Sequence, residues 1–391
     1  MKIKFLLVLS VVYTFSVFGQ SARPLFFDAE KDGYYSYRIP SIVATGKGSI
    51  LAFCAARKGK GGDRDPIDIV MRRSTDSGKT WSQMQVVAHK ENSTCDNSEP
   101  IVDFRTGELH FLYQIDYVRC YYIKSTDDGQ TWSEPVDITY VIEKFKDRYD
   151  WNVLAPGPGH GIQMTNGRLV VPFWLSTGGK SHRPSVVVSV FSDDHGQTWQ
   201  AGDIAIHDNE TTVNPNETCC VQLADGSVMF VSRNESPNYR KLATRSPNGA
   251  TNWSAPVFVD AFFEPICMAS MVRYSRQPEQ SKNRILFCNP DSRQNPFIEQ
   301  GASTPRSAKK RSRNNLTVRM SYDEGNTWTV SKVIDTENGG YSDLAVTPDG
   351  LIHCLYEGGS RHISIISFTL EWLTDGKDKL VKKDKPLNYH P

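Results

Sequence analysis

Five short stretches of this 391-residue chain combine arginine, acidic and tyrosine side chains that could act on an anionic substrate. Arginine presents paired N–H donors that match a carboxylate, and carboxyl groups can transfer protons during catalysis. A phenol can serve as a nucleophile when a neighbouring base takes its proton. The stretches are YRIPSI at 37–42, LAFCAARKGKGGDRDPIDIVMRR at 51–73, NETCCVQLADGSVMFVSRN at 216–234, RSRNNLTVRMSYDEGNTW at 311–328 and GGYSDLAVTPDGLIHCLYE at 339–357.

Each stretch alone also has an ordinary structural explanation. Arg38 could be a surface arginine close to a proline, and Glu217 and Arg233 could stand at the two ends of a plain hairpin. The five stretches become informative only if the elements between them bring them together.

The overall charge argues against two classes of partner. Lys plus Arg number 45 against 44 for Asp plus Glu, which leaves a formal net charge of +1. This balance gives no electrostatic reason to expect nucleic acid or an anionic membrane as partner. The many aromatic residues, with 28 Gly and 21 Pro, favour short strands and turns over long helices.

The first residues, MKIKFLLVLSVVYTFSVFGQ, are typical of a secretory signal peptide. Lys2 and Lys4 precede an apolar run, and small residues follow it, which predicts a signal peptide over 1–19 and a single domain over 20–391. A membrane anchor is the alternative, but the run is short for the span of about 20 residues that a helix needs. We therefore expect a soluble exported protein that is secreted, periplasmic or lysosomal, depending on its source.

Eight cysteines follow this leader. They include no CxxC pair, so structural zinc is not expected. In an exported protein they could form disulfides, or they could be small buried apolar residues.

An eight-residue pattern, S-x-D-x-G-x-T-W, recurs along the chain. Copies start at 74, 125, 192 and 321, and a degenerate copy with Asn in place of Asp starts at 246. Internal repeats at this spacing indicate a propeller or a solenoid. The residues on either side alternate as in strands, so each copy is predicted to be a hairpin turn.

Each position of the repeat has a physical role in such a turn. The Asp accepts hydrogen bonds from its own turn, the Gly adopts a positive φ, and the Trp is a large apolar wedge between neighbouring sheets. Asp76, Asp127, Asp194 and Asp323 are therefore predicted to be structural rather than catalytic.

The repeat resembles the Asp-box of β-propellers, and together with the five stretches it is similar to the exo-α-sialidase (neuraminidase) family of retaining glycoside hydrolases. This resemblance runs through nearly the whole chain after the leader. It implies an all-β fold, a six-bladed β-propeller of four-stranded antiparallel sheets, with the boxes on the outer rim.

The resemblance also implies a carboxylate-binding pocket. Arg38, Arg233 and Arg313 match three arginines that clamp the substrate carboxylate, and Arg57 matches a further arginine of the pocket. Glu357 matches an acid that braces the first of the three. Converging cations repel one another, so supporting acids are expected around them.

Three residues match the catalytic positions of the family. Tyr341 would be the nucleophile, Glu217 the base that takes its proton, and Asp63 the acid/base at the leaving oxygen. Asp65 is a competitor for the last role, and Asp68 less so because it falls in a predicted strand. A neutral phenol avoids the repulsion that an anionic nucleophile would meet beside the substrate carboxylate. The resemblance implies no metal and no organic cofactor.

One position departs from the family pattern. Many relatives carry an acid one or two places before the second pocket arginine, where this chain has Ala55 and Ala56. The brace for Arg57 is therefore missing or supplied by another acid such as Asp65.

Several further residues have two interpretations. Arg311 is a poorer match than its neighbour for the third clamp arginine, and Arg319 is expected to be structural. His160, in GPGHGIQ, could contact substrate or be incidental to a tight glycine loop. Cys219 and Cys220 point to opposite strand faces and are interpreted as packing residues or disulfide partners.

The sequence thus predicts an enzyme that hydrolyses terminal sialic acids from glycoproteins, glycolipids or oligosaccharides. Two alternatives remain open at this point. One is an enzyme of the same fold that acts on a related nonulosonic acid, or gives a transfer or intramolecular product. The other is a non-catalytic Asp-box propeller that binds glycans or proteins.

Overall fold

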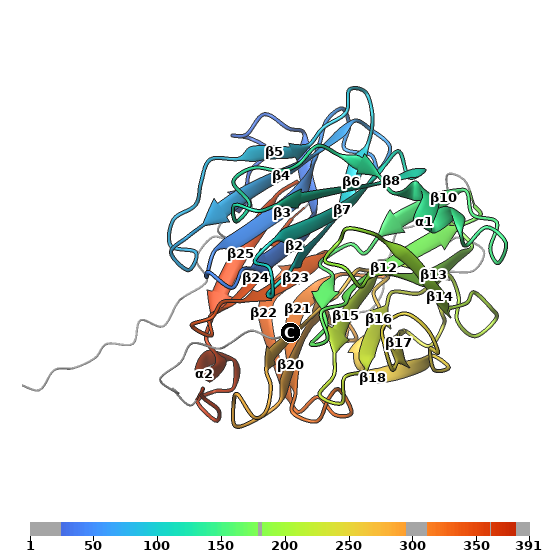
Figure 1. The fold of residues 1–391 in the computed structure, drawn as a ribbon. Helices are drawn as coiled ribbons and strands as arrows, with labels where there is room; N and C mark the ends of the chain where they lie inside the picture. Colours follow the sequence, from blue (N-terminus) through green and yellow to red (C-terminus); the bar gives the residue numbers. More distant parts are fainter. Residues whose placement is uncertain (1–24, 179–181, 295–310, 360, 381–391) are drawn as a thin grey trace, which may run out of the picture.

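The computed structural model describes residues 25–178, 182–294, 311–359 and 361–380 of the chain. Six antiparallel sheets follow one another around a ring and form a six-bladed β-propeller, as Figure 1 shows. The predicted fold class is confirmed, except that one sheet has five strands rather than four. The predicted signal peptide, 1–19, lies outside the described residues.

The sheets are numbered here in chain order from the first complete one. Sheet 1 holds β2 (Ser36–Ala44), β3 (Ile50–Arg57), β4 (Ile67–Ser74) and β5 (Gln85–Ala88). Sheet 2 holds β6 (Cys95–Val102), β7 (Leu109–Ile115), β8 (Arg119–Ser125) and β9 (Val136–Asp137). Sheet 3 holds β10 (Val153–Pro156), β11 (Ile162–Gln163), β12 (Leu169–Ser176), β13 (Ser185–Ser192) and β14 (Gln200–Ile206).

The second half of the chain repeats this plan. Sheet 4 holds β15 (Thr218–Gln222), β16 (Val228–Ser232), β17 (Arg240–Ser246) and β18 (Val257–Phe263). Sheet 5 holds β19 (Ser270–Ser275), β20 (Arg284–Pro290), β21 (Asn314–Ser321) and β22 (Val330–Asn338). Sheet 6 combines β23 (Ser342–Val346), β24 (Ile352–Glu357) and β25 (Ile363–Phe368) with β1 (Leu25–Phe27).

Two short helices complete the described residues, α1 (Thr139–Glu143) and α2 (Leu370–Leu373). Neither these nor any other helix in the described part of the chain is long and apolar enough to span a membrane. All eight cysteines are buried free thiols, which fits their interpretation as packing residues.

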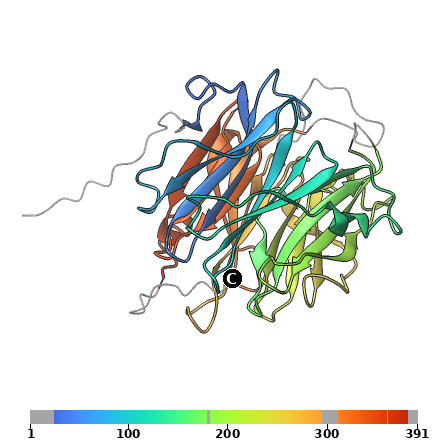
Figure 2. The same ribbon diagram turned by 45° about the horizontal axis from the view of Figure 1, so that its top comes forward.

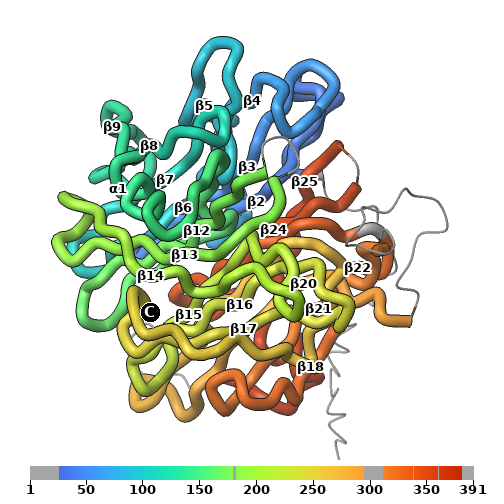
Figure 3. The backbone as a smooth tube through the Cα atoms, turned by 90° about the vertical axis from the view of Figure 1, so that its right-hand side faces the viewer, coloured from blue at the N-terminus to red at the C-terminus, as the bar shows by residue number. Residues whose placement is uncertain are grey.

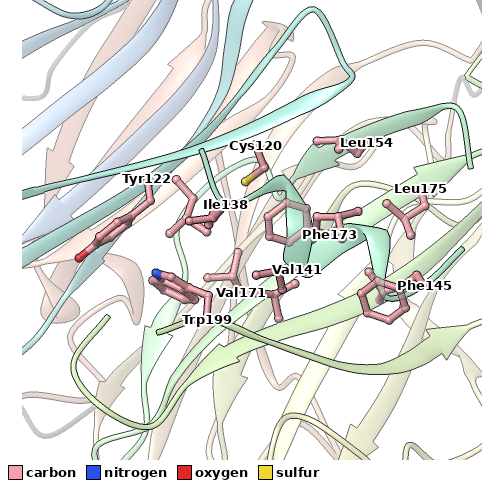
Figure 4. Close-up of a cluster of buried hydrophobic side chains, with 14 of the residues drawn as sticks. Cys120, Tyr122, Ile138, Val141, Phe145, Leu154, Val171, Phe173, Leu175 and Trp199 are labelled. Carbon is pink, nitrogen blue, oxygen red and sulfur yellow. The ribbon is translucent and has the colours of Figure 1, made fainter. Parts of the chain in front are cut away.

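Both faces of the inner strands are covered by neighbouring sheets. Strands β3, β6 and β12 are buried along their whole length, whereas both residues of the outer strand β9 are exposed. This explains why segments such as ILAFCAAR read as continuous apolar runs rather than as alternating patterns. Figure 4 shows such packing between sheets 2 and 3, where Tyr122, Trp199 and Val171 join Val141 and Phe145 in and beyond α1.

The ring of sheets is closed by strands from the two ends of the described chain. The short strand β1 pairs antiparallel with β25, so the last sheet takes its outer strand from the start of the chain. Figures 2 and 3 both show the blue sheet near the N-terminus beside the red sheet near the C-terminus. Residues more than three hundred positions apart therefore lie side by side, as the Arg38–Glu357 contact illustrates.

The repeated turn has the internal hydrogen bonds predicted from its sequence. In the first copy, the Asp76 carboxylate accepts from the Ser74 hydroxyl at 2.8 Å, the Thr80 amide at 2.9 Å and the Thr80 hydroxyl at 2.6 Å. The other three complete copies repeat this set. The Trp is a wedge between blades, since Trp132 lies against Phe53 of sheet 1 and Phe111 of sheet 2.

The degenerate copy keeps the turn with a different side chain. Asn248 stands in the Asp position, and its Oδ1 accepts from the Ala250 and Thr251 amides at 2.9 Å each. An amide oxygen can take over the turn bonds because they need an acceptor rather than a charge.

Each copy joins the third strand of a sheet to its fourth strand. In the five-stranded sheet 3 these are β13 and β14, counted along the order β10-β12-β13-β14. This connection exists in sheets 1 to 5, whereas in sheet 6 the third and fourth strands come from opposite ends of the chain. Six blades therefore need only five turns, which accounts for the number of copies in the sequence.

In the four complete copies, the residue before the box glycine varies and contacts the preceding blade. Ser77, Asp128, His195 and Glu324 have positive φ angles of 57°, 65°, 57° and 60°. This left-handed conformation is uncommon outside glycine and turns the side chain toward the preceding sheet. The contacts run from Ser77 to Asp349 of sheet 6, from Asp128 to Arg73 and Ser49 of sheet 1, from His195 to Asp103 of sheet 2, and from Glu324 to the Ala224 amide of sheet 4.

These contacts predict a specific loss of stability. Glu324 accepts from the Ala224 amide at 2.7 Å and from Arg273 Nη1 at 3.1 Å, and Arg273 is buried. In Glu324→Gln one of two acceptor oxygens becomes a donor, so we expect a loss of about 1–3 kcal/mol in the free energy of unfolding. Calorimetry should give a lower Tm for this variant than for Glu134→Gln, the same change at an exposed site. Equal Tm values for the two variants would show that the contacts of Glu324 with Ala224 and Arg273 do not stabilise the fold.

Candidate active site

All six sheets contribute residues to a cavity of about 570 Å³ at one end of the propeller. Site residues lie at the starts of first strands, at the ends of second strands, or in the connection from a second strand to a third, and these places share one end because successive strands are antiparallel. The Asp-box turns follow third strands and therefore lie at the opposite end. The cavity is lined by Arg38, Ile39, Gly62, Asp63, Arg64, Asp65, Asn97, Tyr117, Trp174, His182, Arg183, Asn216, Glu217, Arg233, Arg313 and Tyr341.

All eight residues selected from the sequence converge here. Six of them line the cavity, while Arg57 and Glu357 stand behind it and contact residues that do. They come from sheets 1, 4, 5 and 6 and their connections, so no single stretch of chain contains the site.

Tyr341 lies at the centre of the site, one residue before β23. Its hydroxyl donates to the Glu217 carboxylate, and Arg233 Nη1 lies 2.7 Å from the hydroxyl oxygen and 2.6 Å from Glu217 Oε2. Burial raises the pKa of Tyr341 and the nearby Arg233 charge opposes this rise. The phenol is therefore neutral in the free protein, with an acceptor for its proton already in place.

The hairpin predicted from the third stretch explains how this contact forms. Strands β15 and β16 pair directly, with Thr218 opposite Ser232. Glu217 and Arg233 flank this pair, and the Arg233 amide donates to the Glu217 carbonyl at 2.8 Å. Their side chains consequently leave the same end of one hairpin.

Two further guanidinium groups approach the phenol ring of Tyr341. The Cζ atoms of Arg38 and Arg313 lie 5.2 Å and 5.4 Å from its centroid. With Arg233 they place three cations around one side of the cavity, which suits a carboxylate ligand.

Glu357 supports this cluster from behind, as expected from the resemblance. Its Oε1 accepts from Arg38 Nε at 3.0 Å, and its two oxygens accept from the Ile39 and Tyr341 amides at 3.1 Å each. Burial would raise the pKa of Glu357, but the charges of Arg38 and Arg313 bring it below the usual value. The acid is therefore ionised and fixes both an arginine and the backbone of Tyr341.

Asp63 lies across the cavity in the loop between β3 and β4. Its Oδ1 is 2.7 Å from Arg57 Nη1 and 3.7 Å from Arg38 Nη1. Partial burial raises the pKa of Asp63, but the two arginines outweigh this and lower it overall. In the free protein Asp63 is thus an exposed, ionised carboxylate.

The acids near Asp63 have other tasks. Asp65 Oδ2 accepts from the Lys60 and Gly62 amides at 2.9 Å each, so Asp65 caps the loop that carries Asp63. Asp68 accepts from the Tyr34 hydroxyl at 2.7 Å and does not line the cavity.

Asp96, which the sequence interpretation missed, stands where a brace for Arg57 was expected. Its Oδ2 lies 3.7 Å from Arg57 Nη2, and both side chains are only 1% exposed. Burial raises the pKa of Asp96 to about 6, although the Arg57 charge opposes the rise. The brace thus comes from sheet 2 rather than from Asp65. Its position near the start of an inner strand, as for Arg38, is the signal that could have identified it.

The sequence interpretation also missed three aromatic residues that form one wall of the cavity. Tyr117, Trp174 and His182 line one side of the cavity and come from the β7–β8 turn, the end of β12 and the β12–β13 connection. No sequence pattern marks them, because they meet only when sheets 2 and 3 pack together.

The remaining ambiguous residues lie outside the cavity. His160 Nδ1 is 2.9 Å from Asp343 Oδ1, and His160 borders a separate apolar space of about 80 Å³ between the inner strands. Arg311 donates to the Glu264 and Ser236 carbonyls, and Arg319 pairs with Asp291, so both are structural.

Within the described residues, no group of three or more His, Cys, Asp and Glu side chains is arranged to hold a metal ion.

Comparison with known proteins agrees with this arrangement. The model of the BNR repeat-like domain family matches residues 48–354. A sialidase of Micromonospora viridifaciens is 31% identical over 88% of this chain and 53% of its own length, and one of Bacteroides fragilis is 26% identical over 88% and 64%. The chain thus spans roughly half to two thirds of these curated relatives.

A solved structure has the same fold. The Hadza microbial sialidase Hz136 matches with a TM-score of 0.71 and 24% identity, over 88% of this chain and 68% of that one. Because the family model covers residues 48–354, and with them most of the propeller, the chain belongs to the BNR repeat-like domain family.

Proposed function

We propose that this protein is an exo-α-sialidase that removes terminal sialic acids with retention of anomeric configuration. The observation that carries the proposal is the three-way contact of Tyr341, Glu217 and Arg233 in a cavity with two further arginines. The relatives named sialidases support the same reaction class. Its substrates would be sialylated glycoproteins, glycolipids and oligosaccharides.

Recognition would begin with the substrate carboxylate. Arg38, Arg233 and Arg313 face the cavity, and the guanidinium group binds carboxylates through two parallel hydrogen bonds. Glu357 already fixes Arg38, so little ordering is needed on binding. The carboxylate would place the neighbouring anomeric carbon beside Tyr341.

In the first step Tyr341 would attack this carbon. Glu217 takes the phenol proton as the bond from the Tyr341 oxygen to the anomeric carbon forms. The bond to the leaving oxygen breaks at the same time, and Asp63 gives that oxygen a proton. The product is a covalent sialyl-tyrosine, an exception to the carboxylate nucleophile of most retaining glycosidases.

The second step reverses these roles. Asp63, now ionised, takes a proton from water as the water oxygen bonds to the anomeric carbon. The bond to the tyrosine oxygen breaks, and Glu217 returns the proton to the phenol. A second displacement on the same carbon restores the original configuration.

The charge of the substrate would prepare Asp63 for this work. In the free protein Arg57 and Arg38 keep the pKa of Asp63 low, which disfavours the protonated acid. A bound carboxylate would neutralise part of this positive charge and thus raise the pKa of Asp63. The acid would become protonated mainly when a substrate is in place.

We also propose export of the protein, based on the leader sequence at 1–19. The basic start and the apolar run support this proposal, and recovery of a mature chain that starts at Gln20 would test it.

The first prediction for this function concerns the nucleophile. Tyr341→Phe keeps the ring but removes the attacking oxygen, so turnover of a fluorogenic α-sialoside should fall by at least about 10³-fold. Circular dichroism should show an unchanged fold. Tyr274→Phe is the matched control, because the hydroxyl of this residue in sheet 5 donates to the Gly350 carbonyl in the β23–β24 turn of sheet 6 and lies outside the cavity.

The same experiment separates the alternatives. Proton NMR of the first product should show the α-anomer of free sialic acid. An anhydro sugar or a transfer product would indicate a different fate of the covalent intermediate. If the wild-type protein does not turn over α-sialosides of sialic acid or its N-acetyl-free analogue, the enzyme proposal fails.

The second prediction concerns pH. Asp63 must be protonated to act as the general acid in the first step, so activity should fall as pH rises through the pKa of Asp63. This fall should occur at lower pH for kcat/KM, which reports the free protein, than for kcat, which reports the complex. The reason is that Arg57 and Arg38 lower the pKa of Asp63 most strongly before substrate binds. Profiles measured with sialyllactose should show the two separate limbs, and coincident limbs would contradict the proposed coupling.

A further inference from the structure

A side-chain contact joins the loop of Asp63 to a blade on the far side of the cavity. Arg64, the residue after Asp63, has its Nη2 atom 3.0 Å from Nε2 of His182. The loop belongs to sheet 1, whereas His182 follows β12 of sheet 3, so the contact passes over the intervening sheet 2.

His182 packs against the other two residues of the aromatic wall. Its ring centroid lies 4.6 Å from that of Tyr117 and 5.4 Å from that of Trp174, and both of these side chains are buried. Its φ angle of 54° is in the left-handed region, which costs free energy and persists where surrounding contacts fix it. Arg64 also stacks over the Tyr117 ring, with its Cζ atom 5.3 Å from the centroid.

The chemistry of the contact fixes the state of the imidazole. A guanidinium group only donates hydrogen bonds, so Nε2 of His182 must accept and the ring hydrogen must be on Nδ1. Burial and the charge of Arg64 lower the pKa of His182 to about 4. The ring is therefore neutral, and its acceptor remains available, from weakly acidic to alkaline pH.

The inner part of the loop is anchored in another way. The Asp65 carboxylate caps it, and the Arg57 guanidinium donates to the Gly61 carbonyl at 2.9 Å. Gly61 has a positive φ of 78°, and a Cβ there would come within 2.9 Å of Tyr35 and Ser36. These contacts hold the backbone on either side of Asp63, whereas the Asp63 side chain itself is 57% exposed.

Catalysis would weaken one of the holds on Asp63 itself. In the free protein the Asp63 carboxylate is paired with Arg57 and Arg38. A substrate carboxylate would compete for Arg38, and protonation of Asp63 would remove the charge that pairs it with Arg57. A contact that does not depend on the charge of Asp63 would then help to keep it near the leaving oxygen.

We propose that His182 is a positioning residue for the acid/base Asp63, acting through its hydrogen bond to Arg64. This inference rests on the proposed sialidase function and adds a residue to it. His182 does not react. It fixes the loop that carries the reacting carboxyl group, and so supports turnover of substrates whose leaving group needs a proton.

The need for a general acid depends on the leaving group. Lactose leaves as an alkoxide unless it is protonated, whereas nitrophenolate is stable and leaves without help. A misplaced Asp63 should therefore lower kcat/KM strongly for sialyllactose and very little for a nitrophenyl sialoside. This quantity reports the first step and leaves out the attack of water, which is common to both substrates. A loss of general stability or of carboxylate binding would instead affect both substrates alike.

The test compares two substitutions of His182 in the full-length protein. His182→Phe keeps an aromatic ring on the wall but has no acceptor, so kcat/KM for sialyllactose should fall by about 10- to 100-fold. Its kcat/KM for the nitrophenyl sialoside should stay near the wild-type value. His182→Gln supplies an amide oxygen to Arg64 and should recover much of the lost rate. His207→Phe, the same change at an exposed histidine, is the control.

A double-mutant cycle tests the route through Arg64. If His182 acts through this side chain, His182→Phe combined with Arg64→Met should be no slower on sialyllactose than the slower single variant. Equal losses on both substrates, no loss on either, or additive losses in the cycle would overturn the inference while leaving the sialidase proposal intact. An inactive wild-type protein would overturn both.

Discussion

Closure of the ring between the first and last sheets is the constraint on which the site depends. The strand pairing of β1 with β25 brings Arg38 of sheet 1 against Glu357 of sheet 6. Glu357 also holds the Tyr341 backbone amide, so one buried acid joins the start of the propeller to its end. A chain that failed to close would separate Arg38 from Tyr341. The site is therefore complete only when the whole ring has closed.

Electrostatics at the cavity follows from this assembly. Three guanidinium groups converge on one side, which would be unfavourable in an empty site without nearby acids. Glu357, Glu217 and Asp63 offset that charge in the free protein. A carboxylate ligand bound there would take over part of this role. Under the proposed function, its charge would serve both for binding and for raising the pKa of Asp63.

The propeller separates stability from chemistry along its axis. The Asp-box turns lie at the end of the molecule away from the cavity, where the variable residues of the four complete copies each contact the preceding blade. The sequence repeat does not reveal these contacts between blades, because the residue that makes them is Ser, Asp, His or Glu in different copies. The shared feature is a positive φ, which lets each side chain reach the preceding sheet.

The residues alone determined the repeat and its hairpin turns, because a turn needs only its own Asp, Gly and Trp. The six-bladed fold and the eight residues that meet at the cavity came from the resemblance of the sequence motifs to the sialidase family. Only the tertiary structure decided which acid braces Arg57, because Asp96 reaches it from another sheet. It likewise separated His160 from the cavity and brought Tyr117, Trp174 and His182 together. These contacts join segments that are far apart in the chain, and their partners are chosen by the packing of one blade on the next. No pattern within a single strand or turn carries that information.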